Sequence, residues 1–339
     1  MGPSNRGGPT RRPSRSRRSG LTGKAIEESV EPSPPVSPPQ RRRPAINWRP
    51  WVWAFPALFL LGVFLLWPVL RTIQISFYDG TVINPTQEFI GVDNYQRLLT
   101  EDPFFIRREW PPWSALFNSA LWVVFFTSGV VGMGMLVAVL ADKVRYEKLA
   151  KAIIFLPLVI SFTAASVVFR LVYAASPDIG LINSVLDSIG LSPIAFLGEV
   201  NWANFAIIAA GIWVWASLAM TILAAAYKSL PGEVMEAAAI DGSNAWQTFW
   251  RVSVPMMVGP IIVVALTMII NALKAIDLVL VMTAGGPRGS SRIVGYTVFL
   301  EIFNNNKAGY GSAAAVLLLI LMVPLMWYQL RQIRHGAER

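Results

Sequence analysis

Six long stretches of the chain are almost entirely apolar, and they constrain the fold more than any other feature. They cover about residues 51–77, 114–141, 149–173, 202–227, 255–282 and 311–333. A helix needs roughly 20 mostly apolar residues to cross the hydrocarbon core of a bilayer. Lipid offers the backbone no hydrogen-bond partners, so spanning stretches form helices or a closed barrel. Because strict apolar–polar alternation is missing, the sequence predicts an all-α polytopic membrane protein with six transmembrane helices.

The net charge of +9 comes almost wholly from the N-terminal tail. Residues 1–50 hold 11 Lys and Arg against three Glu, which gives +8 and leaves +1 for the rest of the chain. This tail is rich in Pro, Ser and Arg and has little apolar surface to bury, so we expect it to be disordered and to lie on the cytoplasmic leaflet. RNA binding by Arg11 to Arg18 is the alternative, but we expect no nucleic acid partner.

Catalytic and metal-binding side chains are scarce. Cysteine is absent, and the single histidine, His335, stands in the polar C-terminal segment. An ATP-binding loop would need Gly, four residues, and Gly-Lys followed by Ser or Thr. The nearest approach is Gly23-Lys24, which Ala25 follows. We therefore expect no enzyme activity, no catalytic residue, no metal and no cofactor bound by this chain, and any ATP would be hydrolysed by another polypeptide.

Positive charge alternates between the two sides of the membrane. With the N-terminus inside, the cytoplasmic side receives 20 Lys and Arg and the opposite side six. Cytoplasmic loops carry an excess of Lys and Arg, so both termini are predicted inside. The membrane domain is predicted to cover residues 51–335. Residues 78–113 then form an external cap, which would serve either as a docking surface or as a simple linker. Residues 228–254 form a cytoplasmic loop.

The cytoplasmic loop has the local signals of two short helices and a turn. Pro231 suits the first turn of a helix, and Glu233 and Glu236 interact favourably with the N-terminal end of the helix dipole. Asp241-Gly242 supplies the turn, because glycine takes positive φ without strain. A second short helix with Trp246 follows, before Pro255 opens the next span.

This loop resembles the EAA motif of permease subunits in ATP-binding-cassette importers. The family pattern is Glu-Ala-Ala, three residues, Gly, nine residues and Ile-x-Leu-Pro. Glu236, Ala237, Ala238 and Gly242 match it, and Val252 to Pro255 end it with two Val in place of Ile and Leu. The resemblance implies a coupling helix, with Asp241 in its turn, that docks on an ATP-binding subunit through Glu236. An interfacial helix without a partner is the alternative.

Other segments resemble permeases of the carbohydrate-uptake type; they are Phe89 to Tyr95, Phe155-Leu156-Pro157 and Met282 to Pro287. Two further segments, Tyr146 to Lys151 and Lys274 to Asp277, resemble the maltose and α-glucoside branch of these permeases. The resemblance covers most of residues 50–335. It implies a multi-pass protein of the cell membrane that forms half of a pathway for a sugar or oligosaccharide. The implied partners are a second permease subunit, an ATPase dimer and an extracellular solute-binding protein.

Polar residues in the fifth predicted span are the candidates for solute contact. Asn271, Lys274 and Asp277 recur every three residues, so they would share one face of a continuous helix. Ionisable groups inside a bilayer are costly and usually serve a function. Mutual neutralisation of Lys274 and Asp277 is the structural alternative. Trp213 and Trp215 are candidates for stacking on sugar rings, although core or interfacial roles are ordinary for Trp. Close helix packing is the expectation for Gly129, Gly132, Gly134 and Ala138.

Two other classes of function remain to be weighed against an importer subunit. A self-sufficient secondary transporter of a small polar solute would usually have more spans and an internal repeat. An enzyme embedded in the bilayer would need convergent His, Cys or paired carboxylates in its spans. Neither pattern is evident in this sequence.

Overall fold

The computed structural model describes residues 49–107, 113–142 and 146–337. The chain divides into two units, Met1–Ala54 and Phe55–Arg339. Of the first unit only residues 49–54 are described, and they begin helix α1, Arg49–Leu61. The disordered tail predicted for residues 1–50 therefore falls almost wholly outside the described residues and stays a prediction.

Within the described residues, four straight segments are long and apolar enough to cross a membrane. They are Val52–Ile75, Ala115–Ala141, Ala203–Lys228 and Ala308–Gln332. The first joins α1 to α2 (Trp67–Ile75) through the π-helical turn η1 (Gly62–Leu66). The others are α4 (Ala115–Leu121) with η3 (Trp122–Phe126) and α5 (Thr127–Asp142), then α9 (Ala203–Lys228), and α16 (Ala308–Ala337). Two bent pairs bring the candidate spans to between four and six.

The third predicted span, residues 149–173, is not one continuous helix. α6 (Glu147–Val159) and α7 (Phe162–Val172) meet at 103°. Pro157 removes a backbone donor in the last turn of α6, and Ile160 is extended. Ser161 then caps α7, its Oγ accepting a hydrogen bond from the Ala164 N–H at 3.2 Å. The break thus has local causes that a reading by hydropathy alone passes over.

The fifth predicted span, residues 255–282, is broken as well. A run of α11 (Ala245–Thr248), η4 (Phe249–Ser253) and α12 (Val254–Met256) meets α13 (Val258–Leu273) at 75°. α13 ends at Leu273, and Lys274 and Ala275 separate it from α14 (Ile276–Met282). At the second break, Gly295 of α15 packs closely against the end of α13. A Cβ added to Gly295 would stand 3.0 Å from the Leu273 carbonyl oxygen. The prediction of one helix over this span is wrong.

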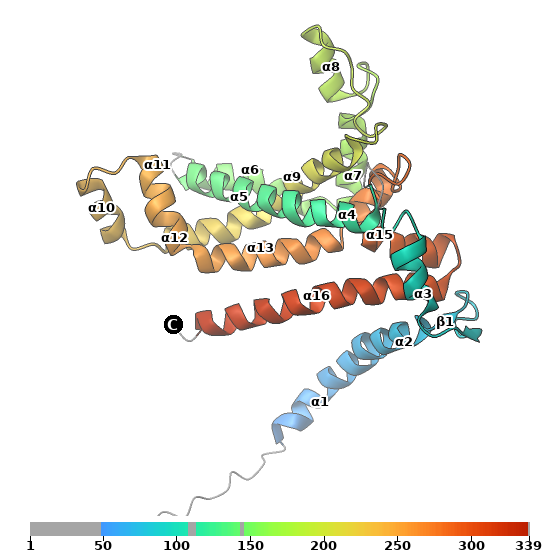
Figure 1. The fold of residues 1–339 in the computed structure, drawn as a ribbon. Helices are drawn as coiled ribbons and strands as arrows, with labels where there is room; N and C mark the ends of the chain where they lie inside the picture. Colours follow the sequence, from blue (N-terminus) through green and yellow to red (C-terminus); the bar gives the residue numbers. More distant parts are fainter. Residues whose placement is uncertain (1–48, 108–112, 143–145, 338–339) are drawn as a thin grey trace, which may run out of the picture. The chain divides into compact units, whose positions relative to one another are not determined.

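Short elements occupy the connections. Strands β1 (Tyr78–Asp79) and β2 (Glu88–Phe89) pair antiparallel, with Tyr78 opposite Phe89. The helical turns are α3 (Asp93–Gln96), η2 (Arg97–Glu101), α8 (Leu181–Ser188), α10 (Gly232–Ile240), α15 (Val294–Phe299) and η5 (Leu300–Asn304). Figure 1 places β1, α3 and α15 at one end of the bundle, here called the cap end. α10, α11 and the C-terminal end of α16 lie at the other, the coupling end.

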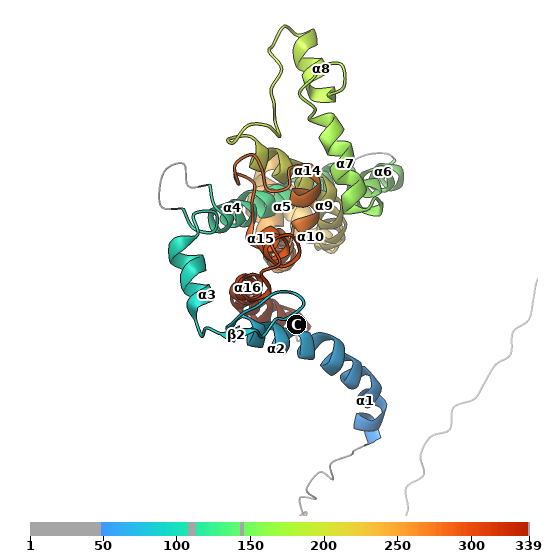
Figure 2. The same ribbon diagram turned by 90° about the vertical axis from the view of Figure 1, so that its right-hand side faces the viewer.

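The main core forms where α5 packs along α9, which lie side by side in Figures 1 and 2. A Cβ added to Gly134 would stand 2.6 Å from the Ala219 Cβ. Gly129 faces Ile212 as closely, and Ala138 is buried, whereas Gly132 borders open space. The close packing predicted for this small-residue stripe is therefore confirmed except at Gly132.

A second, smaller core holds the cap end together. Its buried members come from the cap and from α4, α15 and α16; they are Leu98, Phe105, Ala115, Val294, Ala313 and Ala314. Asn94 ties the cap to the chain just after α2, because its Nδ2 donates to the carbonyl oxygens of Ser76 at 3.0 Å and Tyr78 at 2.9 Å. The Tyr95 hydroxyl shares a hydrogen bond of 2.6 Å with the Ser76 Oγ. Asn94 and Tyr95 of the Phe89–Tyr95 segment thus have a structural role in this chain.

Candidate coupling site and solute pathway

The segment from Pro231 to Gly242 folds as one helix and a closed turn. Pro231 precedes α10 in an extended conformation, and Glu233 lies in its first turn. Gly242 has φ +79°, a conformation that costs an L-residue with a side chain roughly 1–2 kcal/mol. The N–H groups of Asp241, Gly242 and Ser243 donate to the carbonyls of Ala237, Ala239 and Ala238 and end the helix. The predicted helix and Asp-Gly turn are both present.

The second half of the segment begins with a capping box. The Asn244 Oδ1 accepts the Gln247 N–H at 2.9 Å, and the Gln247 Oε1 accepts the Asn244 N–H at 3.1 Å. The rings of Trp246, Phe249 and Trp250 then pack against one another, with centroids 5.0–6.4 Å apart. Local hydrogen bonds and stacking therefore shape this half, and the half-buried Phe249 also packs against the main core.

Few side chains join the two halves. The buried Ser253 Oγ donates to the Met235 Sδ at 3.8 Å, and Ala238 is buried three residues after Met235. Glu236 and Ala237 are exposed on α10, and Asp241 and Gly242 are exposed in the turn. Ile240 is 86% exposed. The motif residues thus lie on α10 and its turn at the coupling end (Figure 1). All of them but Ala238 are exposed.

The three candidate pathway residues do not share one helix face. Asn271 lies in α13 and its Nδ2 donates to the Thr267 carbonyl at 2.9 Å, whereas Asp277 lies in α14. Lys274 stands in the break between the two helices. The expectation of a shared face is wrong because it assumed a continuous helix. Lys274 and Asp277 are both exposed, and no ion pair joins these two described residues.

Both tryptophans of α9 pack against α7 instead of standing free. Trp215 stacks on Phe162 with centroids 5.3 Å apart, and Trp213 meets Phe169 edge-on at 5.4 Å. Trp213 keeps 46% of its surface exposed. These rings therefore help to hold α7 after the sharp bend.

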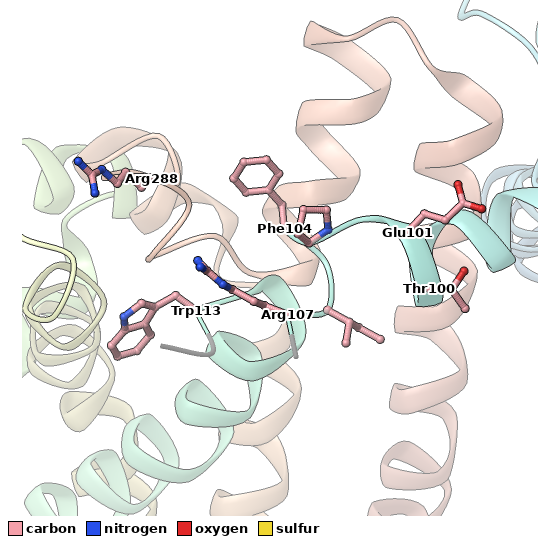
Figure 3. Close-up of a pocket in the computed structure, with 8 residues that line it drawn as sticks. Thr100, Glu101, Phe104, Arg107, Trp113 and Arg288 are labelled. Atoms are coloured by element: carbon pink, nitrogen blue, oxygen red, sulfur yellow. The ribbon is translucent and has the colours of Figure 1, made fainter. Parts of the chain in front are cut away.

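Two of the pockets at the cap end are lined by both charged and aromatic side chains. One, of about 420 Å³, is lined by Thr100, Glu101, Pro103, Phe104, Ile106, Arg107, Trp113 and Arg288. In Figure 3, Arg107, Trp113 and Arg288 gather on one side, and Thr100 and Glu101 lie on the other. The second pocket, of about 510 Å³, borders the buried pair of Arg292 and Glu301. Both offer charged and aromatic groups to a polar partner.

The buried ion pair was missed by the sequence analysis. The Arg292 Nη2 donates to the Glu301 Oε1 at 2.8 Å, and the Arg292 Nε donates to the Thr297 Oγ1 at 3.1 Å. The second carboxylate oxygen, Glu301 Oε2, accepts a hydrogen bond from the Asn305 Nδ2 at 2.9 Å. In the sequence, Glu301 follows Arg292 by nine residues, but both lie in a connection where no helix was expected, so their pairing was not predicted.

The Gly-Gly-Pro connection after α14 is held by Tyr296. The Tyr296 hydroxyl donates to the Ala284 carbonyl at 2.9 Å, and Gly285 has φ +77°. Burial raises the pKa of Tyr296, although Arg292 opposes this, so the hydroxyl stays protonated as a donor at neutral pH.

Among the described residues, no group of three or more His, Cys, Asp or Glu is placed to hold a metal ion.

Known proteins match this chain over most of its length. Residues 130–334 match the model of the binding-protein-dependent transport system inner membrane component. The osmoprotective compounds uptake permease protein GgtC of Synechocystis sp. is 42% identical over 82% of this chain and 96% of that protein. The alpha-glucoside transport system permease protein AglF of Rhizobium meliloti is 34% identical over 84% of this chain and 82% of that protein.

A solved structure has the same fold. It is a crystal structure of a bacterial ABC transporter involved in the import of the acidic polysaccharide alginate. The match has a TM-score of 0.70 at 21% identity and covers 85% of this chain and 96% of that chain. Together with the family match and the relative at 42% identity, this places the chain in the family of binding-protein-dependent transport system inner membrane components.

Proposed function

We propose that this inner-membrane component forms half of the translocation pathway of an ATP-binding-cassette importer. In this proposal the chain crosses the membrane six times, each bent helix pair counting as one span, with both termini in the cytoplasm. The coupling end is then cytoplasmic and the cap end is external. The excess of Lys and Arg in the connections at the coupling end supports this orientation.

The exposed motif on α10 carries the proposal. A helix that turns only Met235 and Ala238 toward the rest of the chain has a large face left for a partner. We assign that partner as a separate ATPase, with Glu236 pairing with a basic residue on it. Closure of the ATPase dimer would push α10 and, through Ser253 and α12, move α13. The chain itself would bind no ATP and carry no catalytic centre.

The remaining partners are a second permease subunit and an extracellular solute-binding protein. The latter would dock at the cap end, where the two pockets offer charged and aromatic groups. The name of the relative AglF refers to alpha-glucosides, and that of GgtC to osmoprotective compounds. We propose a sugar or oligosaccharide, such as an α-glucoside, as the solute.

Asn271, Lys274 and Asp277 are proposed to line the solute pathway. Irregular backbone at membrane depth occurs where it lines a cavity or is buried in protein. The break at Lys274 and the exposure of Lys274 and Asp277 fit a polar pathway between two permease chains. Donors from Asn271 and Lys274 and acceptors from Asp277 would serve sugar hydroxyls.

The test compares two glutamates on the same helix. Glu236→Ala is expected to abolish ATP-dependent uptake in vesicles that contain all the subunits, and the control Glu233→Ala should leave most of it. Both side chains are exposed, so neither change should alter stability by more than about 0.5 kcal/mol. Normal uptake by Glu236→Ala would contradict the coupling role. Uptake by the purified chain without an ATPase would instead support the secondary transporter.

A further inference from the structure

A groove between α6 and α9 is not used by the proposed mechanism. It has a volume of about 470 Å³. Its lining consists of Lys151, Ala152, Phe155, Met220, Thr221, Ala224, Ala225 and Lys228. The two helices lie next to each other in Figures 1 and 2. They are tied together by the buried Ser217, whose Oγ donates to the Ile154 carbonyl at 2.6 Å. The groove is therefore a built feature of the helix pair.

The groove joins an apolar floor to two positive charges. Among the described residues that line it, Thr221 is the only one with an uncharged polar side chain, and its hydroxyl already donates to the Ser217 carbonyl at 2.9 Å. Lys151 lies in the second turn of α6, and Lys228 ends α9, so both lysines lie toward the coupling end. Each also interacts within the chain. An ammonium group has three N–H donors, so such an interaction leaves donors for a ligand.

This arrangement excludes a sugar as the occupant. A sugar needs several hydrogen-bond partners along its length, and the described lining of the floor offers none beyond the engaged Thr221 hydroxyl. A free phosphate would meet the lysines but leave the apolar floor exposed. A phospholipid matches both parts, because its phosphate meets the lysines and an acyl chain covers the alanines, Phe155 and Met220.

We propose that the groove between α6 and α9 binds an anionic phospholipid of the cytoplasmic leaflet, its phosphate held by Lys151 and Lys228. Basic pockets between transmembrane helices on the cytoplasmic side recognise anionic headgroups. The inference rests on the proposed orientation, which puts the coupling end in the cytoplasm. The lipid would hold the part of α6 that precedes the bend at Ile160 against the C-terminal part of α9.

The first test measures lipid retention by native mass spectrometry of the purified importer in mixed phosphatidylglycerol and phosphatidylcholine nanodiscs. Lys151→Gln with Lys228→Gln should weaken phosphatidylglycerol binding by about 30-fold, on the order of tenfold or less for each charge. The control is Arg331→Gln with Arg334→Gln, which removes the same charge at the same end but outside the groove. Equal retention in the two double variants would overturn the proposal.

A second variant tests the contribution of the acyl chain to binding separately from that of the headgroup. Ala225→Leu keeps both lysines but fills the groove, so bound phosphatidylglycerol should fall while the chain stays folded. Unchanged retention, together with displacement of the lipid by glycerol 3-phosphate, would show a phosphate site only and contradict the proposal. Oxidant-driven cross-linking of Ala225→Cys to a cysteine introduced into the second permease subunit would assign the groove to that interface and contradict the proposal too. Lipid retention needs no uptake, so its failure is distinct from failure of the coupling role.

Discussion

The cap end and the coupling end of this chain are held in opposite ways. At the cap end, polar groups connect segments far apart in the sequence: the buried Asn118 on α4 donates to the Arg292 carbonyl, and the half-buried Tyr310 on α16 donates to Asp102. At the coupling end, most hydrogen bonds of residues 231–248 join neighbours within five residues. The cap end is thus a fixed frame, and the coupling segment is a locally rigid piece with its motif face left open.

Breaking the frame should have the largest effect on stability. Glu301→Ala leaves Arg292 buried without its counter-ion, and removal of one partner of a buried pair costs about 3–5 kcal/mol. The control Asp93→Ala removes an exposed pair with Arg97, worth roughly 1 kcal/mol or less. Thermal unfolding in detergent measures both. Similar losses for the two variants would mean that the cap end is no firmer than the surface.

Two glycines on α5 test the packing that connects the two ends. Gly134→Ala should lower stability by about 1–3 kcal/mol, because its Cβ would stand 2.6 Å from the Ala219 Cβ. Gly132→Ala should raise stability by about 0.5–1 kcal/mol, since Gly132 borders open space and alanine favours the helix. Denaturation of both variants gives the sign directly. A shared sign would contradict the assigned α5–α9 contact.

A smaller loss of stability is expected in the coupling segment than at the cap end. Gly242→Ala forces a side chain into φ +79°, at a cost of about 1–2 kcal/mol. Because the segment is held locally, hydrogen exchange should accelerate in α10 and α11 and stay unchanged at the cap end. Faster exchange in α15 as well would show that the two ends unfold together, which would contradict a separately held coupling segment.

Local features of the site were predictable from the sequence. The Asp241-Gly242 turn follows from the conformational freedom of glycine, and α10 follows from Pro231 and a run of helix-forming residues. The motif residues therefore follow from the sequence alone. All six spans were predicted as helices from their hydropathy, which is a local property, and four of them are unbroken in the described residues.

Tertiary features were not predictable. The break at Lys274 has no Pro or Gly beside it, and its neighbour Gly295 is 21 residues away in the sequence. The pairing of Arg292 with Glu301 depends on α15 and η5, which lie in a connection where the hydropathy pattern predicts no helix. Where the third span bends, the signals of Pro157 and Ser161 were present, but the apolar run around them outweighed both.

Sidedness of the coupling segment is the most direct test of the account, and the cysteine-free sequence makes it clean. Two exposed isoleucines form a matched pair: Ile240 on α10 is 86% exposed, and Ile83 in the cap is 93% exposed. Each is replaced singly by cysteine and treated with a membrane-impermeant maleimide. We expect Ile83→Cys to react in intact cells, and Ile240→Cys to react only in inverted vesicles and to be protected by bound ATPase. Labelling of Ile240→Cys from outside, or equal labelling with and without the ATPase, would contradict the account.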